Sequence, residues 1–361
     1  MKITKVPGFG KYGRIIDDLD FSTMTDEEWM EIGRGHLKNL LTIIRNPKGL
    51  TGDVYLKRIE QFGPQIYSGL GARLAKKYGH PVNYYDLKSQ EDLDRDDKRA
   101  IEIRKYMLEK LESGRYLPRV TGAKDDQGNM LGTFDSGDLG WHSNESSQLN
   151  FIPEVSLWGN YKMIGSATGF MQTADYYESV SNSFRSELDD MMVVHAYRPG
   201  GLSAAEIESA DFSSLMQQSF CPVDGAETPL VLTSPGGIKG LHYTINSVAS
   251  IKGMSQKESN EVFRQLNRGL FTDEYTYYHH YQHDNDLCMF DNSITLHCRV
   301  KGDKARKAYR LQYFPTNLID SPWYPYSDPE ISNLFVEQLT EVVTNLKVTN
   351  FKLPIKRDLS I

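Results

Sequence analysis

The chain has 361 residues, and its 39% hydrophobic content is enough for a sizeable core. It carries 48 acidic and 41 basic residues, a net charge of -7, and has no basic stripe that would follow a phosphate backbone. Nucleic acid is therefore not an expected partner. No stretch approaches the ~18 apolar residues of a membrane span, and the N-terminus lacks the apolar run of a signal peptide. Three cysteines without a CxxC pair suit a reducing compartment, so we expect a soluble, cytoplasmic protein.

Helices dominate the expected structure of the first third. Thr25 precedes three acidic residues and marks a helix start, because its hydroxyl can cap backbone amides and the acids suit the positive end of the helix dipole. This helix should run to about Leu37. Leu40 to Ile44 is an apolar run short enough for a buried strand. Further helices are expected at about 54–62 and 69–78, and residues 92–114 have a helical face that would pack on the outside.

Short strands dominate the expected structure of the rest. From residue 151 to 300, short apolar runs alternate with turn sequences such as Gly159-Asn160 and Pro235-Gly236-Gly237, which is typical of a sandwich or barrel. Helices at 173–188 and 257–270 interrupt the strands, and a C-terminal helix is expected at 333–346. We predict one domain over residues 1–361, mainly β, with flanking helices. Its architecture would be a distorted jelly roll, the cupin-like double-stranded β-helix.

Two remote stretches carry candidate metal ligands. His142 and Asn144 would share one face of an extended strand, because side chains alternate along it. His297, in the strand that begins near Phe290, is the candidate third ligand. Two imidazoles and one oxygen donor on one side of an ion form the arrangement of non-heme Fe(II) oxygenases, which leaves the other side open.

Six segments in order resemble the taurine dioxygenase family of Fe(II)/2-oxoglutarate-dependent oxygenases. The segments span roughly residues 8 to 315: Gly8 to Gly10 with Ile15 to Asp20, Trp141 to Asn144, Gly165 to Glu178, Pro235 to Tyr243, Phe290 to His297, and Arg306 to Arg310. The resemblance implies Fe(II), 2-oxoglutarate and O2 as cofactor and cosubstrates. It also implies hydrogen abstraction from an unactivated C–H bond of a small-molecule substrate.

Asn144 departs from the family pattern, which has an aspartate at this position. An amide oxygen is a neutral and weaker donor, so the site loses one negative charge. Three interpretations remain open: the amide oxygen coordinates iron, the amide only hydrogen-bonds a water or anion beside an open position as in related halogenases, or Glu145 substitutes after a bulge. The first is favoured because asparagine has the length of aspartate. An inactive relative is a further alternative.

The resemblance also assigns the cosubstrate. Thr168 matches a threonine that hydrogen-bonds the cosubstrate carboxylate, and Arg306 and Arg310 match an arginine pair that serves the cosubstrate and the substrate. The two arginines are four residues apart and so share a face in a strand, and a guanidinium matches a carboxylate through two parallel hydrogen bonds. Spacing does not divide their roles. Asp291 and Asn292 match a pair that shapes the strand before the second histidine.

Candidate substrate contacts are Arg119, Tyr243, Asn246 and Tyr281, together with Arg310. Extra positive groups would suit an amino acid or another acidic metabolite. The outcome of the reaction would be hydroxylation, desaturation or ring closure. The kainoid synthases of secondary metabolism, which close a ring, are one group of enzymes that this chain is expected to resemble. The alternatives are a halogenase-like enzyme with a vacancy at Asn144 and a non-catalytic binding protein on the same fold. A homo-oligomer is compatible with the sequence.

Overall fold

The structure is a computed structural model. It describes residues 1–63, 119–123, 126, 139–144, 146, 152–196, 226–300, 302–303, 305–319, 323, 333, 336–337 and 340. The helices predicted at 69–78 and 92–114, and most of the one at 333–346, lie outside these residues. Within them, no helix is long and apolar enough to cross a membrane.

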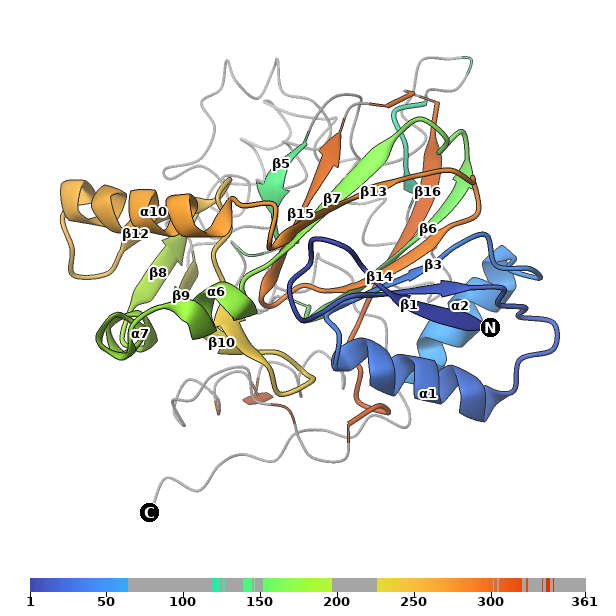
Figure 1. The fold of residues 1–361 in the computed structure, drawn as a ribbon, viewed down its shortest axis with the longest axis horizontal. Helices are drawn as coiled ribbons and strands as arrows, with labels where there is room; N and C mark the ends of the chain where they lie inside the picture. Colours follow the sequence, from blue (N-terminus) through green and yellow to red (C-terminus); the bar gives the residue numbers. More distant parts are fainter. Residues whose placement is uncertain are drawn as a thin grey trace, which may run out of the picture.

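Two β-sheets face each other at the centre of the molecule (Figure 1). Neighbouring strands are antiparallel, except for the parallel pair β2 and β3. The main sheet has the order β1 (Lys2–Lys5), β2 (Arg14–Asp17), β3 (Leu41–Ile44), β14 (Leu287–Asp291), β6 (Glu154–Tyr161), β16 (Lys307–Tyr313), β4 (Arg119–Val120). The smaller sheet has the order β13 (Thr276–His280), β7 (Ala167–Gln172), β15 (Thr295–Val300), β5 (Leu139–His142). This mainly β architecture confirms the predicted distorted jelly roll.

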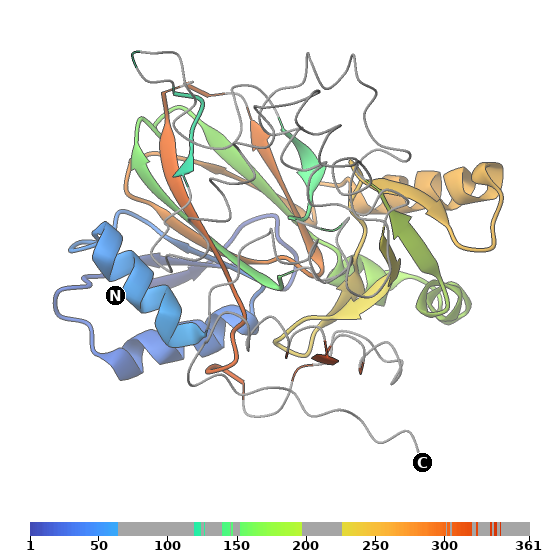
Figure 2. The ribbon, with the colours of Figure 1, turned by 180° about the vertical axis from the view of Figure 1, so that it is seen from behind.

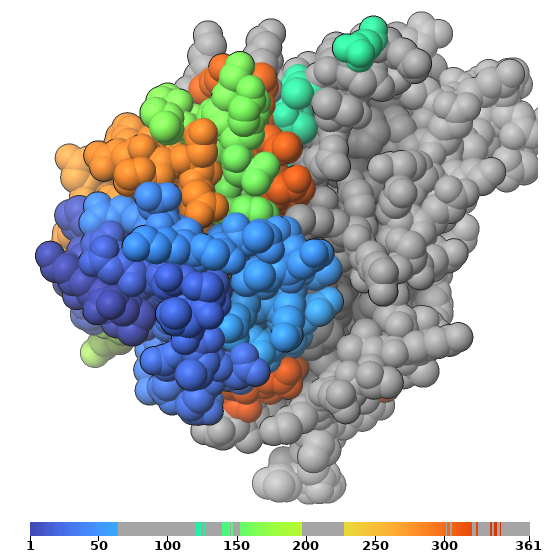
Figure 3. All heavy atoms as spheres, turned by 90° about the vertical axis from the view of Figure 1, so that its right-hand side faces the viewer, coloured from blue at the N-terminus to red at the C-terminus, as the bar shows by residue number. Residues whose placement is uncertain are grey.

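Helices, a three-stranded sheet and a two-stranded hairpin lie outside this pair of sheets (Figure 2). Helices α1 (Asp26–Leu37) and α2 (Gly52–Phe62) contact strands of the main sheet, and α10 (Gln256–Leu270) contacts β12. The other elements are a three-stranded sheet, a two-stranded hairpin and two short helices. They are β12 (Val248–Ile251), β8 (Met192–His195) and β9 (Ala226–Pro229), then β10 (Val231–Thr233) and β11 (Lys239–Leu241), then α6 (Ala174–Ser179) and α7 (Asn182–Asp189). Figure 3 shows N-terminal residues in blue lying against green and orange atoms from the middle and C-terminal parts.

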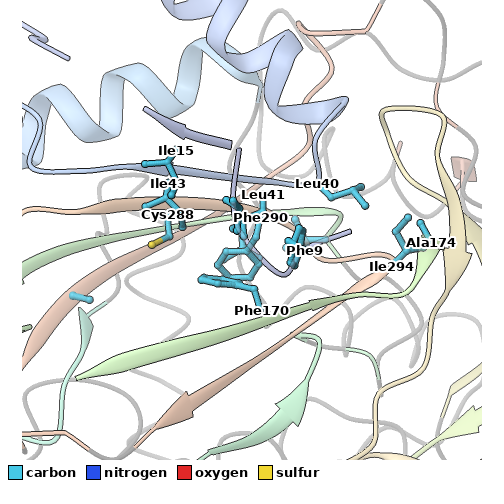
Figure 4. Close-up of a cluster of buried hydrophobic side chains, with 14 of the residues drawn as sticks. Phe9, Ile15, Leu40, Leu41, Ile43, Phe170, Ala174, Cys288, Phe290 and Ile294 are labelled. Carbon is cyan, nitrogen blue, oxygen red and sulfur yellow. The ribbon is translucent and has the colours of Figure 1, made fainter. Parts of the chain in front are cut away.

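Strand β14 is buried on both faces, which explains the apolar run from Leu287 to Phe290. Cys288 and Phe290 face the smaller sheet, where Phe290 lies 5.2 Å from Phe170 of β7 between ring centroids (Figure 4). Leu287 and Met289 face the opposite side and join the cluster beneath α1 and α2. The main sheet is therefore the middle layer between the two helices and the smaller sheet.

Helix α1 begins as the sequence predicts. The Thr25 hydroxyl accepts from the Glu28 amide, and the Glu28 carboxylate accepts from the Thr25 amide, which completes a capping box. The apolar face of the helix includes Trp29, which stacks on Phe62 of α2 at 4.7 Å between ring centroids. This contact packs the two helices against each other.

The single helix predicted at 173–188 is two helices, α6 and α7. Val180 has an extended backbone (φ -72°, ψ 159°), which ends α6. The hydroxyl of Ser181 then accepts a hydrogen bond from the amide of Phe184 and starts α7. The apolar periodicity continues across the break, which explains why the sequence pattern did not reveal it.

Candidate metal and cosubstrate site

Two histidines meet across neighbouring strands of the smaller sheet. His142 ends β5 and His297 lies in β15, and the two residues are direct partners in the antiparallel register. Direct partners point to the same face. Their ring centroids are 4.1 Å apart with the planes inclined by 45°. The structure therefore brings together the two imidazoles that the sequence identifies as candidate ligands.

Both imidazoles are held in the neutral form that binds metals. Burial lowers the pKa of His142 to about 4, with Arg310 and Arg299 adding to the effect. Burial, with His142 and Arg310, also lowers the pKa of His297 well below its usual value. His142 Nδ1 donates to the Gly140 carbonyl at 2.7 Å, which leaves the lone pair on Nε2.

Asn144 lies two residues beyond His142 and is only 5% exposed. Its Oδ1 accepts a hydrogen bond of 3.1 Å from Nη1 of Arg310. A guanidinium can only donate, so this contact assigns the oxygen of the amide to the side of Arg310. The Nδ2 group is buried and has no hydrogen-bond partner among the described residues. Glu145, the alternative ligand, lies outside the described residues.

Arg310 reaches this place from the other sheet. In β16 it is the partner of Leu157 in β6, which is also the partner of Cys288 in β14. All three residues therefore lie on the face of the main sheet that looks toward the smaller sheet. Arg310 thus spans the space between the sheets and places a positive charge beside residue 144.

A second group of predicted residues gathers around Thr168. Its hydroxyl lies 3.0 Å from the hydroxyl of Tyr281, and both side chains are buried. Arg306 is 8% exposed, and burial and the neighbouring Arg299 lower its pKa to about 10, while the proximity of Tyr281 acts in the opposite direction. Thr168, Tyr281 and Arg306 thus provide hydroxyl groups and a cation in a largely dry environment.

Arg299 is a candidate that the sequence interpretation missed. It lies two residues beyond His297 in β15, so both side chains point to the same face, and its partner in β7 is Thr168. Its charge affects the pKa of both His142 and Arg306. The signal was present in the sequence, since strand alternation places His297 and Arg299 on one face of β15. The alternation expected from His142 to Asn144 does not apply, because β5 ends at His142.

Two predicted substrate contacts, Tyr243 and Asn246, are not brought to this group, and the side chain of a third, Arg119, lies outside the described residues. Tyr243 packs in a cluster with Leu296, whose side chain points away from the face of His297, and its hydroxyl donates to Asn267 at 3.0 Å. Asn246 is exposed in a turn. The backbone of Arg119 pairs with Tyr309, next to Arg310, but its side chain lies outside the described part of the chain.

The donor set fits an Fe(II) ion with few protein ligands. Nδ1 of His297 is buried and has no hydrogen-bond partner among the described residues, so a bound ligand would satisfy a polar atom that the fold leaves unsatisfied. Within the described residues no group of three His, Cys, Asp or Glu side chains could hold a metal ion. Asn144, the residue expected as the third ligand, carries an amide and so does not count toward such a group.

Solved structures share the fold over most of the chain. AAD-2 in complex with Mn(II) and N-oxalylglycine is 18% identical with a TM-score of 0.56, and the match covers 87% of this chain and 97% of that one. A putative alpha-ketoglutarate-dependent taurine dioxygenase from Burkholderia xenovorans is 17% identical with a TM-score of 0.56, covering 86% and 89%. A putative alpha-ketoglutarate-dependent 2,4-D dioxygenase from the same organism is 16% identical with a TM-score of 0.52, covering 87% and 96%.

The family follows from the sequence match. A search of curated proteins finds no match. The model of the taurine catabolism dioxygenase TauD, TfdA family matches residues 6–312, which include both histidines and Arg310. Enzymes of this family are dioxygenases that use Fe(II), 2-oxoglutarate and O2. The chain therefore belongs to the TauD, TfdA family and is a 2-oxoglutarate-dependent dioxygenase.

Proposed function

We propose that this dioxygenase removes hydrogen from a C–H bond of a small acidic or amino-acid-derived metabolite, with His142 and His297 holding the iron. The 4.1 Å approach of the two rings is the observation that carries this proposal. When bound, iron and 2-oxoglutarate supply the oxidant from O2, with succinate and CO2 as products. Hydroxylation, desaturation and oxidative cyclisation of the kainoid type are all outcomes of such a step.

The residues of the chain bind and orient the reactants. Arg306, with the hydroxyls of Thr168 and Tyr281, holds the far carboxylate of 2-oxoglutarate, because a buried guanidinium and two hydroxyls match a carboxylate. Arg310 lies beside residue 144 and orients the groups that bind close to the iron. The apolar cluster around Phe290, whose ring lies 4.7 Å from that of His297, helps to exclude water.

An acidic substrate is supported by the charge of the inner face. Three guanidinium groups, those of Arg299, Arg306 and Arg310, lie close to the histidine pair or to one another. An aspartate at position 144 would lower this positive charge, whereas the neutral amide of Asn144 does not. Arg299 is the added candidate for the substrate carboxylate, because it shares the face of His297.

A halogenase-like reaction is the second candidate, and one observation favours it. The oxygen of Asn144 already accepts from Arg310, and Nδ2 is a buried donor without a partner in the described part of the chain. A donor and a cation side by side would stabilise a small anion in place of the missing carboxylate. Reactions run with chloride or bromide, followed by mass spectrometry of the product, separate this candidate from hydroxylation.

A panel of acidic metabolites scored by succinate release tests the proposal without a guess about the product. Amino acids, N-substituted glutamates and dicarboxylates should raise succinate release above the substrate-free rate, and neutral analogues of the same size should not. His297→Ala should abolish the release. Turnover that prefers neutral or cationic compounds would contradict the proposed substrate class.

A further inference from the structure

Asn292 connects the turn between β14 and β15 with the segment that carries Asn144. Its Oδ1 accepts from the amide of Asn144 at 2.7 Å, and its Nδ2 donates to the carbonyl of Asn144 at 2.9 Å. The same Nδ2 donates to the carbonyl of Ile152 at 2.8 Å, and the backbone amide of Asn292 donates to the carbonyl of Pro153 at 2.6 Å. Asn292 is fully buried. One side chain thus holds both backbone polar groups of residue 144.

The turn that presents Asn292 is itself well defined. Oδ1 of Asp291 accepts from the amides of Ser293 and Ile294 at 2.9 and 2.7 Å. The carbonyl of Ile294 accepts from the hydroxyl of Thr173 at 2.7 Å. These bonds hold the turn both internally and against Thr173. The side-chain amide of Asn292 is therefore held in place independently of residue 144.

A second attachment lies two residues further along the chain. The hydroxyl of Ser146 lies 2.9 Å from that of Ser247, which lies 3.2 Å from Nδ1 of His195. All three side chains are buried. The segment after His142 is therefore held at residue 144 by Asn292 and at residue 146 by Ser247.

We propose that Asn292 is a positioning residue that sets the backbone of residue 144, and through it the place of the third side chain beside the two histidines. This inference rests on the proposed metal site. A strand ends at His142, so no ladder hydrogen bonds hold residue 144, and the two bonds from Asn292 take their place. Arg310 then orients the side-chain amide of Asn144. Asn292 sets the position of the backbone that carries this side chain.

The chemistry of the contact favours an amide at position 292. A carboxylate would still accept from the amide of Asn144, but its second oxygen would face the carbonyls of Asn144 and Ile152 and could donate to neither. Asn292→Asp therefore keeps the volume and removes two of the three side-chain bonds. Asn292→Ser removes all three without adding a charge.

The test measures Mn(II) binding to the full chain without substrate, by the electron paramagnetic resonance signal of free Mn(II). Asn292→Ser should raise the Kd for Mn(II) about tenfold or more, as expected when a partner of a ligating segment is lost. Asn285→Ser is the matched control, since Asn285 also bridges two segments, accepting from Trp158 and donating to the carbonyl of Pro47. It should bind Mn(II) as the wild-type protein does.

A double variant separates positioning from general destabilisation. If Asn292 acts through residue 144, Asn292→Ser should add little to the Kd of Asn144→Ala, because the side chain to be positioned is already gone. Independent, multiplying effects on the Kd would overturn the inference, as would wild-type affinity in folded Asn292→Ser. Should that variant not fold, Asn292→Asp provides the same comparison. A wild-type protein that does not bind Mn(II) would instead refute the proposed function.

Discussion

At the scale of single residues, the most consequential feature is a neutral side chain next to a guanidinium. Asn144 and Arg310 lie 3.1 Å apart between Oδ1 and Nη1. With aspartate at position 144 the pair would be ionic, and the site would offer the iron one more negative charge. If the proposed site holds iron, the asparagine offers it a weaker ligand than an aspartate would, and its neutral amide does not cancel the charge of Arg310.

Asn144→Asp should tighten binding of Fe(II) or Mn(II) by about tenfold or more, because a carboxylate is a stronger ligand for these ions than an amide. Turnover should change as well. Free Mn(II) can again be followed by its resonance signal, with Asn285→Asp as a control that adds the same charge elsewhere. An unchanged Kd would mean that residue 144 does not take part in coordination.

Arg306→Lys should raise the KM for 2-oxoglutarate about tenfold, because an ammonium cannot make two parallel hydrogen bonds to a carboxylate. The saturated rate should change little. Arg310→Lys should instead affect the rate or the KM for the substrate. Steady-state succinate release, measured with varied 2-oxoglutarate and then with varied substrate, gives both KM values and the rate. If Arg310→Lys raised the KM for 2-oxoglutarate and Arg306→Lys did not, the roles of the two arginines would be exchanged.

Residue types and their order indicated several side chains that the structure brings together, but not the contacts between them. The two histidines, Thr168, Arg306 and Arg310 could be proposed from the family pattern, whereas Arg299 was missed. The contact of Arg310 with Asn144 joins two sheets, and no local pattern contains it. Tyr243 was expected at the substrate, but a large buried tyrosine that bonds Asn267 has the same sequence signature as one that binds a ligand.

At the scale of elements, the capping box of α1 makes a separate prediction. Thr25→Ala should lower the free energy of unfolding by about 1 kcal/mol, because it leaves the amide of Glu28 without its acceptor. Urea unfolding measures the change, and Ser255→Ala at the matching cap of α10 should give a similar one. The KM for 2-oxoglutarate should stay at its wild-type value. A large change in KM would show that α1 influences the site directly.

Element boundaries were predictable where a local signal exists. Thr25 and the acids after it located α1, and the apolar run near Leu41 located β3. The break at Val180 was missed, because Ser181 starts a new helix within a continuing apolar pattern. Strand pairing was not accessible either, since the register of β5 on β15 joins residues that are 155 positions apart, from His142 to His297.

At the scale of the whole molecule, a buried polar pair fixes α1 to the main sheet. Nε2 of His36, at the end of α1, lies 2.8 Å from a carboxyl oxygen of Glu154 in β6, and both are shielded from water. Burial raises the pKa of Glu154 well above its usual value, and burial and Arg14 lower the pKa of His36 to about 3. Both shifts favour the neutral forms of the two side chains over a buried ion pair.

This pair makes stability depend on pH in a defined direction. The unfolded chain releases the Glu154 proton near pH 4.5, whereas the folded protein keeps it to higher pH, so this contribution is full below pH 4.5 and is lost as pH rises toward the folded pKa. Glu154→Gln removes the titration. The free energy of unfolding of the Glu154→Gln variant minus that of the wild-type protein should therefore increase with pH, by up to about 1.4 kcal/mol per pH unit above pH 5. Urea unfolding from pH 5 to 8 measures this, and a constant difference would contradict it.

The most direct test of the whole account is the visible spectrum of the protein with Fe(II) and 2-oxoglutarate in the absence of O2. If His142 and His297 hold iron while 2-oxoglutarate chelates it, a weak charge-transfer band should develop with both additions and with neither alone. The band should be absent in His297→Ala. A wild-type protein that gives no band and retains no iron would contradict the proposed metal site.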